Sequence, residues 1–95
     1  MYNVKLSKQA EKFLVKLPKF VVAGFVQKFE KLAIDPYSLT GVDTITNPKS
    51  IGVETDIAYR IRVENYRATY TIEDEILTIF IFEIEHRSKV YRNKK

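Results

Sequence analysis

Residues 76–84 (ILTIFIFEI) are apolar at almost every position, and this run constrains the fold more than any other part of the sequence. The run is far shorter than the roughly 20 residues that a helix needs to cross a bilayer. A short apolar run rich in branched and aromatic side chains is typical of a central strand that is covered on both faces. We therefore expect one sheet built around this strand, with helices on one face and partial cover on the other.

Two amphipathic segments nearer the N-terminus can supply that cover. Residues 2–6 alternate apolar and polar side chains, which predicts a half-buried strand. Ser7 then offers an N-cap for a first helix, which Pro18 interrupts. A second helix begins near Lys19 and ends before Pro36, because the residue that precedes a proline avoids helical dihedral angles. The apolar positions of the two predicted helices are Ala10, Phe13, Leu14 and Leu17 in the first, and Val22, Phe25, Val26, Phe29, Leu32 and Ala33 in the second.

Two strands precede the apolar run along the chain. Residues 59–63 alternate so that Arg60 and Arg62 point to one face and the apolar side chains to the other. Residues 66–72 repeat the pattern and place Arg67 on the face opposite to the tyrosines of that strand. These tyrosines are expected to pack in the core rather than to stack on bases.

The connections between these strands are short and polar. Glu64 and Asn65 predict a tight turn, because asparagine tolerates a left-handed conformation, and residues 73–75 form the next turn. The order of elements predicts an α+β fold. In this fold an N-terminal strand, a helical hairpin and an antiparallel three-strand meander form one sheet, with the helices on one face and a short C-terminal tail. Residues 37–57 show little periodicity, and residues 51–56 could add a short strand there.

The size, charge and cysteine content narrow the class of protein. Ninety-five residues correspond to one domain, residues 1–95. The formal net charge of +4 and the pI near 9.3 favour polyanionic partners, either nucleic acid or an acidic protein. The absence of cysteine fits a reducing compartment. The N-terminus lacks the apolar stretch of a signal peptide, so a soluble cytoplasmic protein without membrane association is expected.

All five arginines lie within residues 60–92, whereas the earlier positive charges are lysines. Guanidinium is a planar fork that binds phosphate through paired hydrogen bonds, while a lysine ammonium is a hydrated point charge. Arginines accompanied by tyrosines and a single histidine in a small basic protein suggest a phosphodiester site.

Residues 59–70 (YRIRVENYRATY), together with residues 86–92 (HRSKVYR), resemble the RelE/ParE toxin superfamily. The pattern of that superfamily is roughly Tyr-Arg-Ile-Arg-Val-Gly-Asp-Tyr-Arg, then a hydrophobic strand, then His-Arg-x-x-Val-Tyr. The strand–helix–helix opening also matches, so the resemblance spans nearly the whole chain. RelE-like members cleave messenger RNA, usually in the ribosomal A site, and ParE-like members inhibit DNA gyrase. The terminal Val-Tyr favours the RelE-like branch, with a gyrase inhibitor or a non-catalytic RNA- or antitoxin-binding relative as alternatives.

The resemblance implies roles for individual residues. Arg67 matches the arginine that grips the scissile phosphate, and Arg87 matches a second arginine implicated in charge stabilisation or acid catalysis. Tyr91 matches a tyrosine proposed as the general base or as an orienting group. Arg60 and Arg62 stand where some members have substrate-binding lysines, and because arginine stays protonated it can clamp phosphate but is a poor base.

The general base is therefore expected to be Tyr91 or His86, whose unperturbed pKa lies near physiological pH. His86 could equally be a surface histidine, and the neighbouring Glu85 could orient it or repel RNA. Lys89 and Arg92 in the basic tail are further candidates for substrate binding.

The expected reaction is attack of the RNA 2′-hydroxyl on the adjacent phosphate, which needs a base, an acid and donors for the developing charge. With a single histidine and no dense carboxylate cluster, the sequence predicts metal-independent chemistry without a small-molecule cofactor. The resemblance implies the ribosome and messenger RNA as partners. It also implies a cognate antitoxin whose amphipathic, acidic segment covers the toxin.

Overall fold

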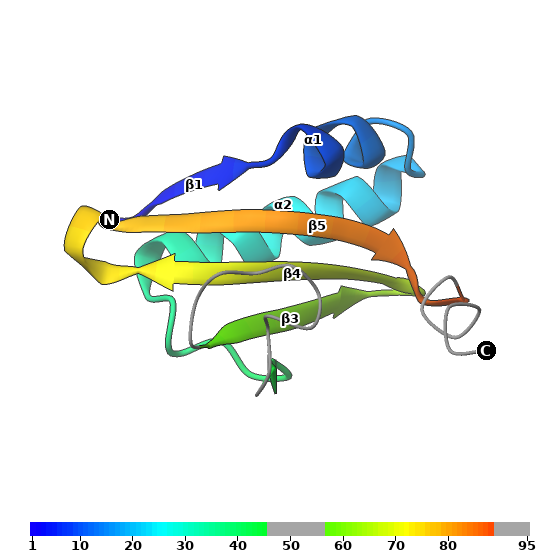
Figure 1. The fold of residues 1–95 in the computed structure, drawn as a ribbon. Helices are drawn as coiled ribbons and strands as arrows, with labels where there is room; N and C mark the ends of the chain where they lie inside the picture. Colours follow the sequence, from blue (N-terminus) through cyan, green and yellow to red (C-terminus); the bar gives the residue numbers. More distant parts are fainter. Residues whose placement is uncertain (46–56, 89–95) are drawn as a thin grey trace.

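The computed structural model describes residues 1–45 and 57–88, which form one five-stranded sheet with two α-helices on one of its faces (Figure 1). The predicted α+β fold is confirmed. In chain order the elements are β1 (Asn3–Leu6), α1 (Lys8–Leu14), α2 (Lys19–Ile34), β2 (Asp43–Ile45), β3 (Ala58–Val63), β4 (Tyr66–Glu73), the 3₁₀ turn η2 (Asp74–Ile76) and β5 (Thr78–His86).

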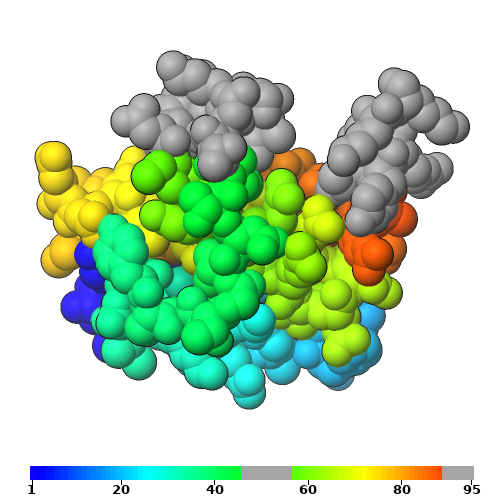
Figure 2. Space-filling model, turned by 90° about the horizontal axis from the view of Figure 1, so that it is seen from below, coloured from blue at the N-terminus to red at the C-terminus, as the bar shows by residue number. Residues whose placement is uncertain are grey.

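The strand order is β1-β5-β4-β3-β2, so the apolar strand β5 lies inside the sheet, between the first strand and β4. Strands β2 to β5 pair antiparallel, and β1 pairs parallel with β5. The edge strand β2 was not predicted. The short strand suggested for residues 51–56 lies outside the described residues. Figure 2 shows the chain between α2 and β2 running along the surface beside β3.

Three of the four helix ends lie at the predicted signals, whereas α1 ends at Leu14, so that Leu17 lies in the turn before Pro18 rather than in the helix. The Ser7 hydroxyl accepts a hydrogen bond from the Ala10 backbone N–H at 3.1 Å, which caps α1. Pro18 occupies the N-cap of α2, and Asp35 is its C-cap. No helix in the described part of the chain is long and apolar enough to cross a membrane.

The buried stripe of α2 differs in part from the prediction. Val21, Phe25, Phe29 and Leu32 are buried, whereas Val26 is 42% exposed. Residues spaced by four and three positions return to the same side of a helix, so Val21 and Phe25 belong to one buried stripe. Val26 lies about 100° round the helix from Phe25 and is therefore outside that stripe. The other buried members of the core are Ala10, Ala58, Ile61, Ala68, Tyr70, Ile79, Ile81 and Ile84.

The β3–β4 hairpin keeps the predicted alternation but not the predicted turn geometry. The positive φ belongs to Glu64, at 55°, and Asn65 is not among the residues with positive φ. The first turn position therefore carries the left-handed backbone, at a residue whose Cβ disfavours it.

A β-bulge in β5 changes which side chains face the helices. Tyr70 pairs with Ile81 while Thr69 pairs with Glu83, so Phe82 is the extra residue on β5. Beyond the bulge the alternation is inverted, and Ile84 lies in the core together with Ile81. This inversion decides on which face the polar end of β5 presents its side chains.

Candidate functional site

The sheet face opposite the helices carries three arginines from the β3–β4 hairpin, and we call it the arginine face. In the register of the hairpin, Arg62 stands directly opposite Arg67, and Arg60 stands opposite Thr69. Their neighbours Tyr59, Ile61 and Val63 point to the helices, which places the arginines on the other side. The structure thus brings Arg60, Arg62 and Arg67 together, as the alternation predicts.

The placement of Arg62 opposite Arg67 puts two like charges on neighbouring strands. Side chains directly opposite in an antiparallel pair are close neighbours, and like charges there are destabilising. The next position across the sheet from Arg67 is Glu85, and the next beyond Thr69 is Glu83. An anion bound between the two guanidinium groups would relieve their repulsion.

Two of these arginines have a buried donor without a partner. The Nε atoms of Arg60 and Arg67 are both shielded from solvent, and neither has a hydrogen-bond acceptor among residues 1–45 and 57–88. Buried unsatisfied donors are rare, and each costs roughly 1–3 kcal/mol. Both lie on the arginine face, which makes this face the strongest candidate for an anion site in the described part of the chain.

Arg62 is arranged differently, because it forms an ion pair with Asp43 of the edge strand. Its Nη2 lies 2.8 Å from Asp43 Oδ2, with the two side chains 57% and 50% exposed. Nothing in the sequence singled out Asp43, since this contact depends on the pairing of β2 with β3. Asp43 is a charged neighbour of the site that sequence analysis missed.

Arg87 lies at the end of the sheet where β5 meets the β3–β4 turn. Its backbone N–H donates to the Asn65 carbonyl at 2.7 Å, and its side chain is exposed. A shallow pocket of about 290 Å³ is lined there by Asn65, His86, Arg87 and Ser88. Arg67 pairs with Glu85, two residues before Arg87, so the two arginines belong to the same end of the sheet.

His86 faces the helices rather than the arginines. Its ring packs edge-on against Tyr66, with centroids 5.0 Å apart, and Tyr66 in turn contacts Phe13 of α1. His86 Nδ1 accepts the Ser88 backbone N–H at 3.1 Å and lies 2.7 Å from the Ser88 hydroxyl. The structure therefore does not bring His86 together with Arg67, and the bulge in β5 is the reason.

Glu85 points to the arginine face, opposite Arg67, while His86 points to the other face. The suggestion that Glu85 orients His86 is wrong, because adjacent residues of a strand project from opposite faces. Tyr91, Lys89 and Arg92 lie outside the described residues, and their roles remain expectations from the sequence.

A second polar cluster occupies the opposite end of the sheet. Both carboxylate oxygens of Asp74 accept tyrosine hydroxyls, from Tyr2 at 2.5 Å and from Tyr37 at 2.6 Å. The hydrogen bond from Tyr2, and to a smaller extent the one from Tyr37, lowers the pKa of Asp74. The hydrogen bond to Asp74 in turn raises the pKa of Tyr37 to about 12. The cluster ties the N-terminus and the α2–β2 connection to the β4–β5 turn.

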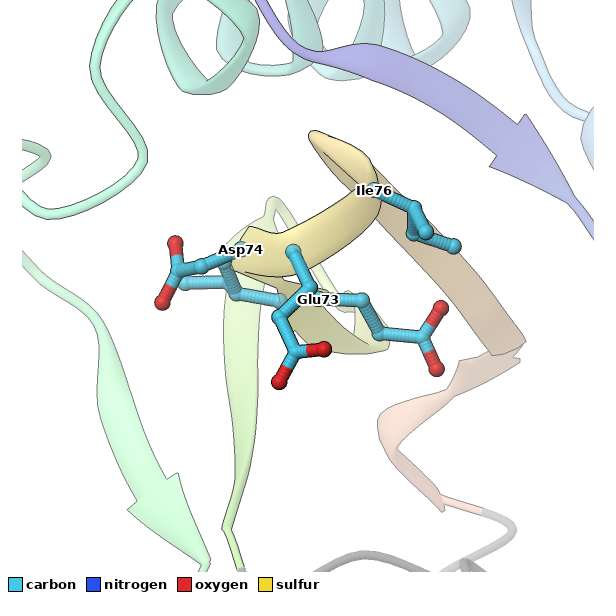
Figure 3. Close-up of a pocket in the computed structure, with 5 residues that line it drawn as sticks. Glu73, Asp74 and Ile76 are labelled. Atoms are coloured by element: carbon cyan, nitrogen blue, oxygen red, sulfur yellow. The ribbon is translucent and has the colours of Figure 1, made fainter.

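The same turn borders a pocket of about 470 Å³, lined by Ile72, Glu73, Asp74, Glu75 and Ile76. Figure 3 shows the side chains of Glu73, Asp74 and Ile76 projecting from this turn in different directions. Among the described residues its lining holds three carboxylates and no cation, which is the wrong charge for a phosphodiester, so we do not assign it to RNA. No group of three or more histidine, aspartate or glutamate side chains in residues 1–45 and 57–88 is placed to hold a metal ion.

Solved structures similar to this chain include chains of toxin–antitoxin complexes. A chain of the archaeal RelE–RelB complex from Pyrococcus horikoshii OT3 superposes with a TM-score of 0.75 at 27% identity, with 93% of this chain and 97% of that chain covered. The RelBE2 complex of Mycobacterium tuberculosis gives a TM-score of 0.66 at 29% identity, covering 90% and 98%. Among curated proteins, Toxin RelG of Mycobacterium tuberculosis is 29% identical over 92 residues, which are 96% of this chain and 97% of RelG.

These similarities define the class as that of RelE-like toxins. The family model described as the ParE toxin of the type II toxin–antitoxin system parDE matches residues 4–91. The chain therefore belongs to the ParE toxin family, within the RelE/ParE superfamily of type II toxins, as its sequence motifs predicted.

Proposed function

We propose that this toxin is a metal-independent endoribonuclease that cleaves messenger RNA in the ribosomal A site and so inhibits translation. The observation that carries the proposal is the pairing of Arg62 with Arg67 on one sheet face, beside the unpartnered Nε atoms of Arg60 and Arg67. A surface with unmet donors and mutually repelling cations is complementary to a polyanion. Nearly the whole chain is similar to RelE-like toxins. Because the RelE-like branch of the superfamily cleaves messenger RNA, this similarity favours RNA as that polyanion.

The reaction divides into steps that this chain can serve. The RNA 2′-hydroxyl loses its proton and attacks the adjacent phosphorus, and the bond to the 5′-oxygen breaks as that oxygen gains a proton. Arg60 and Arg67 hold the phosphate in position, which supplies much of the rate because the nucleophile is internal to the substrate. Arg87, at the same end of the sheet, neutralises the charge that develops on the phosphoryl oxygens.

Tyr91 is proposed as the general base, in preference to His86. The arginines remain protonated and cannot accept the proton. His86 faces α1 through Tyr66, and its Nδ1 already accepts the Ser88 N–H. We assign His86 a positioning role at the end of β5, where it orders the chain that carries Arg87.

The partner that silences the toxin is proposed to be an antitoxin with an acidic, amphipathic segment. Structures similar to this chain have been solved as RelE–RelB complexes. The helical side of the molecule offers exposed apolar residues near the α1–α2 turn, with Val15 76% exposed and Phe20 65% exposed. Lys16 and Lys19 lie between them and would attract acidic side chains.

The test is 5′-end mapping of messenger RNA incubated with programmed ribosomes and the purified toxin. We expect discrete cuts in the A-site codon, lost with Arg67→Ala and with Arg87→Ala. Glu30→Gln is the control, because Glu30 is an exposed residue of α2 on the other side of the sheet. Intact RNA with the wild-type toxin would overturn the proposal.

Tyr91→Phe and His86→Gln separate the two candidates for the base. Loss of cutting in Tyr91→Phe, with cutting largely retained in His86→Gln, is the expected result. The reverse pattern would move the base to His86.

A second candidate function is inhibition of DNA gyrase, because the family model that matches residues 4–91 is that of ParE toxins. A gyrase inhibitor would block supercoiling by purified gyrase and leave ribosome-bound messenger RNA intact. A supercoiling assay beside the mapping experiment therefore distinguishes the two functions.

A further inference from the structure

Asp43 supplies a carboxylate at the arginine face, beside two of its arginines. It stands opposite Arg60 in the register of β2 with β3, and its Oδ2 lies 2.8 Å from Arg62 Nη2. Asp43 thus borders two of the three arginines of this face. It belongs to an edge strand of only three residues.

The Asp43–Arg62 ion pair is accessible and easily exchanged. The two side chains are 50% and 57% exposed, so solvent and ligands reach both groups. Exposed ion pairs of this kind contribute little net free energy, because water and salt compete with them. The ion pair joins a single nitrogen of Arg62 to Asp43, whereas phosphate can engage guanidinium through two parallel hydrogen bonds. A phosphate is therefore the better ligand for this guanidinium.

The three arginines differ in the contacts that their guanidinium groups make in the free protein. Arg60 and Arg67 keep buried Nε donors that have no acceptor in the described part of the chain, while Arg62 is held by an acidic side chain of the same chain. We propose that Asp43 is an internal competitor for substrate phosphate: it occupies Arg62 in the free toxin and is displaced when single-stranded RNA binds. This inference rests on the proposed function, since it names the ligand as RNA.

The consequence is a measurable cost to RNA binding. An RNA phosphate must displace Asp43 before the phosphate can bind Arg62. The wild-type toxin therefore binds RNA as if the charge of Arg62 were partly neutralised. Removing the carboxylate should tighten binding by roughly two- to fivefold, the range set by an exposed ion pair. It should also steepen the dependence of log affinity on log salt by about 0.7, the value for one further phosphate contact on a single strand.

The experiment compares Asp43→Asn with Glu30→Gln, which removes the same charge from the helical side of the molecule. Affinity of the full chain for a fluorescently labelled single-stranded RNA oligonucleotide is measured by anisotropy over a series of salt concentrations. We expect Asp43→Asn to bind more tightly and with a steeper salt dependence than Glu30→Gln. In an Arg62→Ala background, Asp43→Asn should have no more effect than Glu30→Gln. Circular dichroism of each variant verifies that the sheet is intact.

The outcomes separate the inference from the function on which it rests. If binding depends on Arg67 but Asp43→Asn equals Glu30→Gln or weakens binding, the competitor role is overturned and the RNA site stands. If neither wild-type toxin nor Asp43→Asn shows Arg67-dependent binding, the competitor role is overturned, and the 5′-end mapping on programmed ribosomes decides the proposed function separately. A second measurement guards against a folding defect: the Arg62 Nε–Hε signal of the wild-type toxin, followed by nuclear magnetic resonance, should shift on addition of RNA. No shift at saturating RNA would also contradict the displacement of Asp43.

Discussion

Gly24 of α2 lies directly against Val63 of β3, so close that a Cβ at position 24 would stand 2.7 Å from Val63 Cγ1. Real Cβ atoms essentially never come so near another carbon. The contact sets how closely α2 approaches the hairpin whose other side carries Arg62 and Arg67. The arginine face thus depends on a small residue on the opposite side of the sheet.

We expect Gly24→Ala to destabilise the toxin by about 1 kcal/mol, although alanine is the better helix former. Overpacking costs roughly 1–3 kcal/mol, because valine has little rotamer freedom with which to yield, and this exceeds the gain of about 1 kcal/mol from helix propensity. Denaturant unfolding measures the change. In a Val63→Ala background the same substitution should be neutral or stabilising, and an equal loss in both backgrounds would contradict the contact.

Glu64→Gly is expected to stabilise the toxin by about 0.5–1 kcal/mol. Glu64 has a φ of 55°, which disfavours residues with a Cβ and suits glycine. The superfamily pattern carries glycine at this position of the hairpin. Thermal unfolding should show a raised Tm, whereas Asn65→Gly, at a position without positive φ, should give no such gain. A lowered Tm for Glu64→Gly would show that the Glu64 side chain stabilises the fold by more than its left-handed backbone costs.

The Tyr2–Asp74–Tyr37 cluster should make stability depend on pH at both extremes. Because the pKa of Asp74 is lowered, its contribution is present above the ordinary value of 3.8 and is lost as pH falls through the lower folded-state pKa. Because the pKa of Tyr37 is raised from 10.0 to about 12, its contribution is present below pH 10 and is lost towards pH 12. Tm measured across this range should fall at both ends.

Asp74→Asn should lower Tm near neutral pH and flatten the alkaline fall, since its amide can accept fewer phenol hydrogen bonds. An ultraviolet titration of tyrosine ionisation should then show Tyr37 returning towards its ordinary pKa. Tyr37→Phe identifies which tyrosine the titration reports. An unchanged titration in Asp74→Asn would show that the two hydrogen bonds are not formed in solution.

Arg67→Met is expected to abolish RNA cleavage while raising the free energy of unfolding by roughly 0.5–1 kcal/mol. The substitution keeps the length of the side chain but removes a buried unsatisfied donor and the like charge opposite Arg62. The matched control is Arg62→Met, which removes the same like-charge pair but no buried unsatisfied donor, and which also breaks the exposed ion pair with Asp43, so it should raise stability less than Arg67→Met. A loss of stability in Arg67→Met would mean that Arg67 supports the fold rather than the site.

Much of the fold could be read from local patterns. The Ser7 cap, the break at Pro18 and the end of α2 before Pro36 follow from the chemistry of single residues and their immediate neighbours. The alternation in residues 59–63 fixed the common face of Arg60 and Arg62. The motif placed the chain in its superfamily because that motif combines the hairpin with the end of β5.

The placement of His86 could not be read in the same way. Continuing the alternation of Ile79 and Ile81 along β5 puts His86 on the arginine face, but the bulge at Phe82 turns it to the helices and brings Glu85 opposite Arg67. A bulge is set by the pairing of two strands, and the sequence of one strand does not reveal it.

The sequence by itself determined the order of the elements, their apolar faces and the arginine content of the hairpin, because these depend on periods of two and about 3.6 residues within single segments. Only the tertiary structure decided the parallel pairing of β1 with β5, the edge strand that carries Asp43 to Arg62, and the face on which His86 lies. Each of these depends on register between segments distant in the chain, where side chains meet through packing and charge rather than through local periodicity.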